Sequence, residues 1–234
     1  MKTQFKGFKK MNKIYKISLI AASLVIMSCE IPADLNDNPN EITVSDVDAN
    51  LFLNGAQLAN VIVQVSHMNR ISGMYSGQLV GYASLYSNIY GYSLSTVESN
   101  DEWSNAYVGV VANTRHIQTS APDDKLLVGI TKVLEAHAMS TLAILTGDVP
   151  FSEVLSDKDS PKFDDQKAVL DGCSALLSDA ITTLSGATSR SEAYDIYYGG
   201  DKDKWIAAAY TLKARIALIK KDYASALTHA GMGI

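Results

Sequence analysis

The sequence has only two cysteines, Cys29 and Cys173, among 234 residues. The chain therefore cannot form the network of intramolecular disulfides that stabilises many small secreted domains. Cys173 lies in an apolar helical pattern, which favours a buried and unreactive thiol. Stability must come from a hydrophobic core, and a chain of this length can bury one.

Basic residues are scarce after residue 28. Residues 1–28 hold six of the twenty lysines and arginines and none of the twenty-five acidic residues, so the remainder has fourteen basic residues and a net charge of −11. Proteins that bind nucleic acids gain much of their affinity by neutralising phosphates. No basic cluster remains after residue 28, and we expect no nucleic-acid partner.

Recognisable catalytic and metal-binding motifs are also missing. The sequence has no glycine-rich phosphate loop, no nucleophile elbow and no zinc-binding helix motif. The four histidines lack metal-ligand spacing, and His137 in its apolar segment is expected to be a core or interface histidine. No pair of carboxylates can be assigned an acid and a base role. We therefore expect a non-enzymatic protein without a metal site or cofactor.

The N-terminus has the layout of a bacterial lipoprotein signal. Lys13 and Lys16 precede eleven mostly apolar residues, 17–27, and Ser28 and Cys29 follow. This run is too short for a membrane span, which needs about twenty apolar residues, but suits a secretory signal. A small residue before a cysteine resembles the lipobox, so we expect a signal peptide over 1–28 and lipid attachment at Cys29. A plain secretory signal is the alternative, and either Met1 or Met11 could be the start.

The rest of the sequence predicts an acidic flexible tether over 29–43 and one all-α domain over 44–234. Prolines and a run of asparagine and aspartate mark the tether. Beyond it, apolar residues recur at intervals of three and four, and strand alternation is weak and confined to residues 80–97. The spacing predicts helices over 45–66, 101–119, Asp123 or Asp124 to Gly147, 165–184, 203–220 and from 224 onward.

Residues 204–230 predict two helices joined by a short turn. Their alternation of alanines with large side chains is typical of tetratricopeptide-type repeats. One such repeat cannot bury its apolar face alone and needs a neighbour. Residues 126–155, with a turn at Gly147 and Asp148, are the candidate partner.

Residues 81–92 are the main candidate binding segment. We expect this stretch to be non-helical, with aromatic rings that stack on the C–H faces of sugars and polar groups that bind sugar hydroxyls. The alternative is that the tyrosines pack beneath the loop as a small satellite core. The candidate ligand residues are Tyr82, Tyr86, Asn88, Tyr90 and Tyr92.

Several motifs follow one another in a fixed order along the chain. The lipobox and an Asp-Asn-Pro-Asn tether come first, and Trp103, Tyr107 and Asn113 then form an aromatic-then-asparagine pattern. The later motifs are residues 146–155, the segment Asp195-Ile-Tyr-Tyr-Gly-Gly-Asp201, Trp205 and Leu212-Lys-Ala-Arg215. Together they resemble the SusD/RagB family of nutrient-binding surface lipoproteins of Bacteroidetes, and the resemblance covers essentially all of the chain after the signal.

The resemblance implies a tetratricopeptide-like scaffold held by lipid at the outer membrane, on the cell surface. Such a protein captures glycans or other small nutrients and delivers them to a SusC-like TonB-dependent transporter. The alternative is a lipid-anchored scaffold that binds only proteins. Tyr210 stands where relatives often have asparagine. Family members are about twice as long, so we expect this chain to be an N-terminal part.

Overall fold

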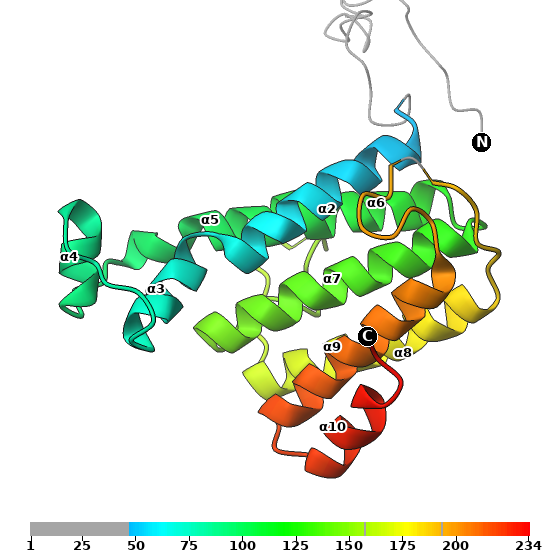
Figure 1. Ribbon diagram of the computed structural model, residues 1–234. Helices are drawn as coiled ribbons and strands as arrows, with labels where there is room; N and C mark the ends of the chain where they lie inside the picture. The colour runs from blue at the N-terminus through cyan, green and yellow to red at the C-terminus, as the bar shows by residue number, and fades with distance from the viewer. Residues whose placement is uncertain (1–46, 157, 193) are drawn as a thin grey trace, which may run out of the picture. The chain divides into compact units, whose positions relative to one another are not determined.

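Figure 1 shows the computed structural model of the chain, which describes residues 47–156, 158–192 and 194–234. The predicted signal peptide, Cys29 and the tether over 29–43 lie outside these residues. The described part is helical, which confirms the predicted all-α class, and it contains no β pairing beyond one bridge between Val149 and Asp164. Its elements are α2 (Ala49–Val65), α3 (His67–Tyr75), α4 (Ser84–Tyr90), η2 (Thr96–Ser99), α5 (Asn100–Ser104), η3 (Asn105–Val111), α6 (Ala112–Ser120), α7 (Lys125–Thr146), α8 (Gln166–Ser185), α9 (Lys202–Ile219) and α10 (Tyr223–Ala230).

Aspartate side chains define where the main helices begin. A carboxylate at the N-cap accepts a backbone N–H that has no partner within the helix, which stabilises the first turn. This arrangement confirms the predicted starts of α7 and α9, whereas the start predicted at residue 45 is too early because α2 begins after its cap. The capping residues are Asp48, Asp124, Asp165, Asp201 and Asp222.

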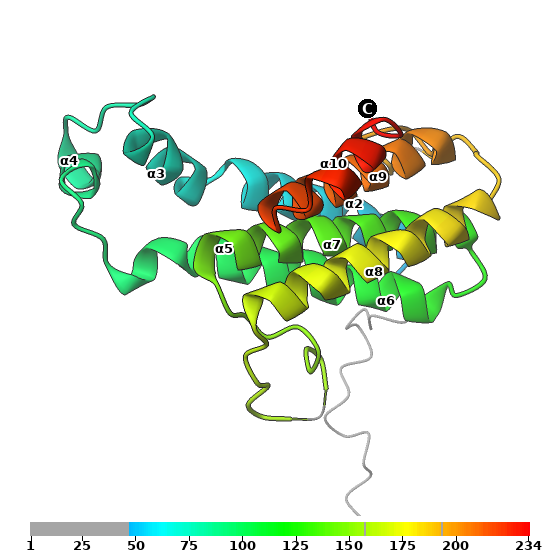
Figure 2. The same ribbon diagram turned by 90° about the horizontal axis from the view of Figure 1, so that it is seen from below.

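Helix α7 is the centre of the main core. It is apolar around most of its circumference and ends at Gly147, whose φ of 90° is a backbone conformation that favours glycine. It is long and apolar enough to cross a membrane, but most of it is buried in the protein, as expected for a core helix. Figures 1 and 2 show α7 between α2 and α8, and it packs against both.

The helices after residue 124 form two antiparallel pairs, α7 with α8 and α9 with α10, and α8 also packs on α9. A side chain at Gly129 would come within 2.4 Å of Leu184, so the glycine permits the close approach of α7 and α8. The repeat partner predicted over 126–155 is wrong in its second half. Among the described residues, no helix lies between Gly147 and Gln166, and a bridge holds Val149 to Asp164 within this connection.

The helix predicted over 101–119 is present as three consecutive segments, α5, η3 and α6. The middle one, η3, is a turn of π-helix, and Gly109 within it lies against Ala59 of α2. Helix α2 packs on η3, α6 and α7. Helices α2 and α5 to α9, with η3, thus share one core that holds Leu53, Val110 and Trp205.

Helices α3 and α4 form a separate small unit that the sequence analysis does not predict. Both views show them extending beyond the rest of the bundle, away from α8 and α10. Three buried residues, Ile71, Met74 and Ile89, make up their own cluster. The expectation that 81–92 is non-helical is wrong, because α4 occupies Ser84–Tyr90. Its serine, asparagine and tyrosine residues are weak helix formers, so this short helix depends on packing against α3.

Candidate functional site

The structure divides the five predicted ligand residues. Tyr82 and Tyr86 line one pocket together, whereas Asn88 and Tyr90 are exposed on α4 outside it. Tyr92 stacks on Tyr75, with ring centroids 4.9 Å apart. The aromatic segment is therefore not one continuous binding face.

The pocket has a volume of about 370 Å³ and lies between α3, α4 and the segment that joins them. Tyr82 is 88% exposed, whereas Tyr86 is half-buried and packs on the satellite cluster. The satellite-core alternative thus describes Tyr86, whereas the ring of Tyr82 is open to solvent. The lining residues are Arg70, Met74, Leu79, Val80, Gly81, Tyr82, Ala83 and Tyr86.

The turn at the end of α3 sets the position of the apolar residues that line the pocket. Gly77 has a φ of 74°, and the N–H groups of Gly77 and Gln78 donate to the carbonyls of Met74 and Gly73 at 3.1 and 2.9 Å. This is the Schellman arrangement, which reverses the chain after a helix. Leu79 consequently folds back onto Gly73, where an added Cβ would lie only 2.8 Å from its side chain.

Gly81 brings the joining segment against the start of α4. A Cβ at this position would lie 2.1 Å from the backbone oxygen of Tyr86, so any other residue would force the two segments apart. Ser84 and Tyr92, near the two ends of α4, have φ values of 52° and 61°. Such conformations are uncommon for residues other than glycine and often accompany functional segments.

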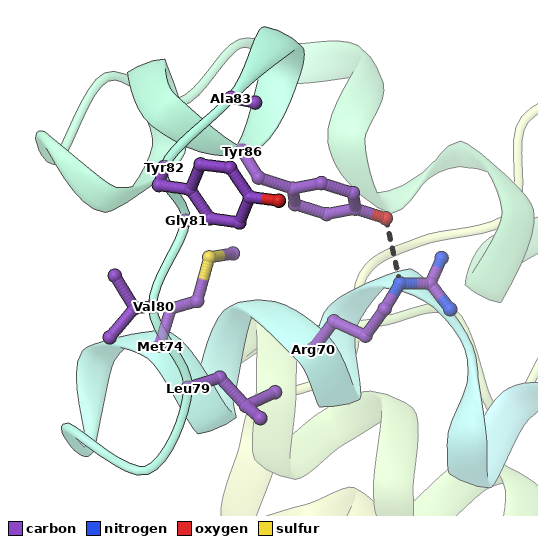
Figure 3. Close-up of a pocket in the computed structure, with 8 residues that line it drawn as sticks. All are labelled: Arg70, Met74, Leu79, Val80, Gly81, Tyr82, Ala83 and Tyr86. Atoms are coloured by element: carbon purple, nitrogen blue, oxygen red, sulfur yellow. Dashed lines mark hydrogen bonds between the residues drawn. The ribbon is translucent and has the colours of Figure 1, made fainter.

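Arg70 supplies the pocket's charge and is missing from the predicted site residues. Its Nε donates a hydrogen bond of 2.8 Å to the Tyr86 hydroxyl. Figure 3 shows both tyrosine hydroxyls pointing toward the side where Arg70 lies, with Val80 and Met74 on the other side. The pocket therefore has one polar and one apolar end. The sequence does contain a signal, because Arg70 is the only lysine or arginine between Lys16 and Arg115.

Two glutamates hold α3 against the helices that follow. Glu102 accepts hydrogen bonds from the Ser66 hydroxyl at 2.5 Å and the Met68 N–H at 2.8 Å. Glu98 pairs with His67 at 2.5 Å and also accepts from Ser95. The hydrogen bond from His67, followed by the one from Ser95, holds the pKa of Glu98 below its usual value. These contacts fix the side of the pocket that carries Arg70.

The Asp195–Asp201 segment, by contrast, supports the scaffold. Asp195 is buried and accepts hydrogen bonds from Gln57 Nε2 at 2.6 Å and from Trp205 Nε1 at 2.8 Å. It also accepts backbone N–H groups of its own loop, including that of Gly200. Trp205 lies in the main core.

The aromatic-then-asparagine helix also has structural contacts. The Tyr107 hydroxyl donates to the carbonyl of Pro150 at 2.7 Å, and Trp103 packs beside Tyr107 and Phe163. Asn113 bonds the Gly109 carbonyl within its own helix. These residues tie the segment 100–120 to the connection after α7.

His137 and Cys173 both occupy structural positions. His137 Nδ1 lies 3.2 Å from Asn60 Nδ2, and burial first and Arg215 second lower the pKa of His137 to about 4. Cys173 is fully buried, and burial followed by the charge of Glu135 raises the pKa of its thiol to about 12. A thiol of this kind is unreactive, which agrees with the sequence analysis.

The geometry of the pocket suits binding. An exposed aromatic ring beside apolar side chains can stack on an apolar ligand face, and hydroxyl and guanidinium groups can bind polar substituents. None of the residues that line it is a carboxylate or a histidine. The pocket thus offers recognition groups and no acid–base pair.

Comparisons with known proteins identify the fold. Residues 39–232 match the SusD-like family model described as "Starch-binding associating with outer membrane". No curated protein matches. Two SusD-type structures from Bacteroides thetaiotaomicron, one titled a SusD/RagB family protein, align with 80% of this chain at 22% and 21% identity and TM-scores of 0.73 and 0.67.

A third solved structure is a chitin-binding SusD homologue from Flavobacterium johnsoniae. It aligns with 78% of this chain at 20% identity and a TM-score of 0.59. The alignments cover 43%, 42% and 43% of the three solved chains, so this chain spans less than half of their length. At these identities the structures show a shared fold.

Proposed function

Because the chain belongs to the SusD-like family, we propose that it is a lipid-anchored nutrient-binding protein of the outer membrane, on the cell surface. It captures glycans or other small nutrients and acts by binding, without catalysis. The observation that carries this proposal is the pocket in which Tyr82 and Tyr86 meet.

The chemistry of the pocket supports a sugar ligand. Pyranose rings have apolar C–H faces that stack on aromatic rings, while their hydroxyls need hydrogen-bonding partners. Tyr82 offers an exposed ring, and Tyr86 and Arg70 offer polar groups beside it. The volume of about 370 Å³ falls in the range of small-ligand sites.

Lipid attachment at Cys29 and delivery to a SusC-like TonB-dependent transporter complete the proposal. Both rest on the sequence motifs and on the family resemblance. Replacing Cys29 with alanine should abolish labelling by palmitate and release the protein from membranes. Labelling that persists in this variant would contradict the lipid attachment.

The binding test is calorimetry of the purified protein against a panel of oligosaccharides. Tyr82→Ala should weaken any binding about fivefold or more, because it removes the exposed stacking surface. Tyr90→Ala is the matched control, since Tyr90 is also an exposed tyrosine of this segment but lies outside the pocket. If no glycan binds, or if both variants behave alike, the proposed site is wrong.

A protein-binding scaffold is the second candidate, and the outer face of α2 favours it. This helix is apolar on both sides, although only one side is buried in the main core. Its exposed apolar residues are Leu51, Leu58, Val61, Ile62 and Val65. Under this alternative a membrane partner co-purifies with the protein and no sugar of the panel binds.

A further inference from the structure

We propose that the pocket selects acidic sugars, with Arg70 pairing with the ligand's carboxylate or sulfate group. This inference rests on the proposed function and names the chemical class of its ligand. It starts from the charge distribution around α3 and α4. Between Ser66 and Val97 the sequence contains no aspartate or glutamate, and Arg70 is its only lysine or arginine.

The guanidinium of Arg70 has unused binding capacity. The side chain of an arginine has five N–H donors, and in the described part of the chain the Nε–H bond to Tyr86 is the one hydrogen bond that the Arg70 side chain makes. No carboxylate of the described residues lies within ion-pair distance of it. Both terminal nitrogens therefore remain available to an external oxyanion, and arginine binds such groups in a two-pronged, charge-assisted geometry.

Nearby carboxylates are occupied by other partners. Glu98 is bound by His67 and Ser95, and Glu102 is bound by Ser66 and the backbone of Met68. These carboxylates of η2 and α5 have hydrogen-bonding partners other than Arg70. Among the described residues, no carboxylate thus pairs with Arg70.

The Tyr86 hydroxyl fixes the direction of the guanidinium. By accepting the Nε–H at 2.8 Å, it places the cation at the polar end of the pocket, as Figure 3 shows. The Arg70 Cζ atom lies 5.9 Å from the centre of the Tyr86 ring, so the cation also interacts with the aromatic face. A sugar ring on Tyr82 could direct its acidic group to this end.

The overall acidity of the protein opposes anionic ligands only at long range. Exposed charges beyond about 8 Å are largely screened at physiological salt. The first fixed charge that a ligand meets inside the pocket is that of Arg70. Selectivity for an acidic group is therefore a local property of this site.

The test uses matched probes and calorimetry of the purified protein. Oligogalacturonate is compared with its methyl ester, and sulfated with unsulfated malto-oligosaccharides. The protein should bind the acidic member of at least one pair about tenfold more tightly, since one charge-assisted pair contributes on that scale. This preference should weaken as sodium chloride is raised, a readout that needs no variant.

Arg70→Gln should abolish the preference, so that the acidic and the neutral member of each pair bind within about twofold of each other. Hydrogen exchange of the amides in α3 and α4 reports whether the pocket is intact in this variant. Lys167→Gln is the control, because it makes the same change of charge at an exposed position on α8. The inference is overturned if the neutral probes bind and the acidic ones are not preferred, or if the preference for acidic probes survives Arg70→Gln. In either case the proposed function stands. If neither class of probe binds, the proposed function fails and the inference falls with it.

Discussion

The main helical bundle and the α3–α4 unit are built by different means. The bundle shares one large core to which α2 and α7 to α9 contribute, and aspartate caps define where its helices begin. The α3–α4 unit has three buried apolar residues, residues in strained backbone conformations near both ends of α4, and several exposed tyrosines. The large core and the candidate binding pocket thus lie in separate regions.

This difference affects how easily each region unfolds locally. Segments with few buried contacts unfold locally at a lower free energy than the core of the same protein. The pocket therefore belongs to the region with the lower local stability. Adjustment of α3 and α4 around a ligand would leave the bundle unchanged.

The largest expected effect comes from the bundle. Only 1% of the surface of Leu134 in α7 is exposed. Leu134→Ala should lower the free energy of unfolding of the whole domain by about 3 kcal/mol, because burial is lost and a cavity remains. Urea denaturation followed by circular dichroism measures this loss. A change below about 1 kcal/mol would show that α7 is not the centre of the core.

The sequence predicts the bundle well because its signals are local and repeated. For α7 an aspartate cap, a long apolar pattern and a terminal glycine agree, and the structure confirms all three. The unit around α4 has no such agreement, since most residues of Ser84–Tyr90 are weak helix formers and its helix depends on α3. Contacts between segments decide its structure, and periodicity does not record them.

The candidate site is only half predictable for the same reason. Tyr82 and Tyr86 are visible as aromatic residues in a polar segment, but only the fold separates them from Tyr90 and Tyr92. Arg70 lines the pocket because the chain turns back at Gly77, after the end of α3. Its isolation from all other lysines and arginines is a usable signal in the sequence.

Acidification offers a second way to probe the bundle. The pKa of His137 is lowered from 6.5 to about 4, first by burial and then by Arg215, so between these values the unfolded chain takes up a proton that the folded protein does not. The contribution of His137 to the free energy of unfolding is fully present above about pH 6.5 and decreases as the pH drops toward 4. The loss is at most about 3.4 kcal/mol, at 1.36 kcal/mol per pH unit.

His137→Gln isolates this contribution, because glutamine can still accept the hydrogen bond from Asn60 and does not titrate. Urea denaturation at several pH values should show a smaller loss of stability between pH 6.5 and 4 in the variant than in the parent protein. Parallel curves for the two proteins would show that His137 does not carry the effect.

The smallest expected change in global stability comes from the α3–α4 unit. Ile89 is fully buried in the satellite cluster, and Ile89→Ala should destabilise that unit by about 2 kcal/mol through the cavity it leaves. Hydrogen exchange of the amides in α3 and α4 should accelerate, while the free energy of unfolding of the bundle changes by less than about 0.5 kcal/mol, since the two clusters open separately. Leu85→Ala is the matched control, because Leu85 lies one turn earlier on α4 and is 46% exposed. If Ile89→Ala lowers global stability as much as Leu134→Ala, the two regions form one cooperative unit, and the proposed independence of pocket and bundle is wrong.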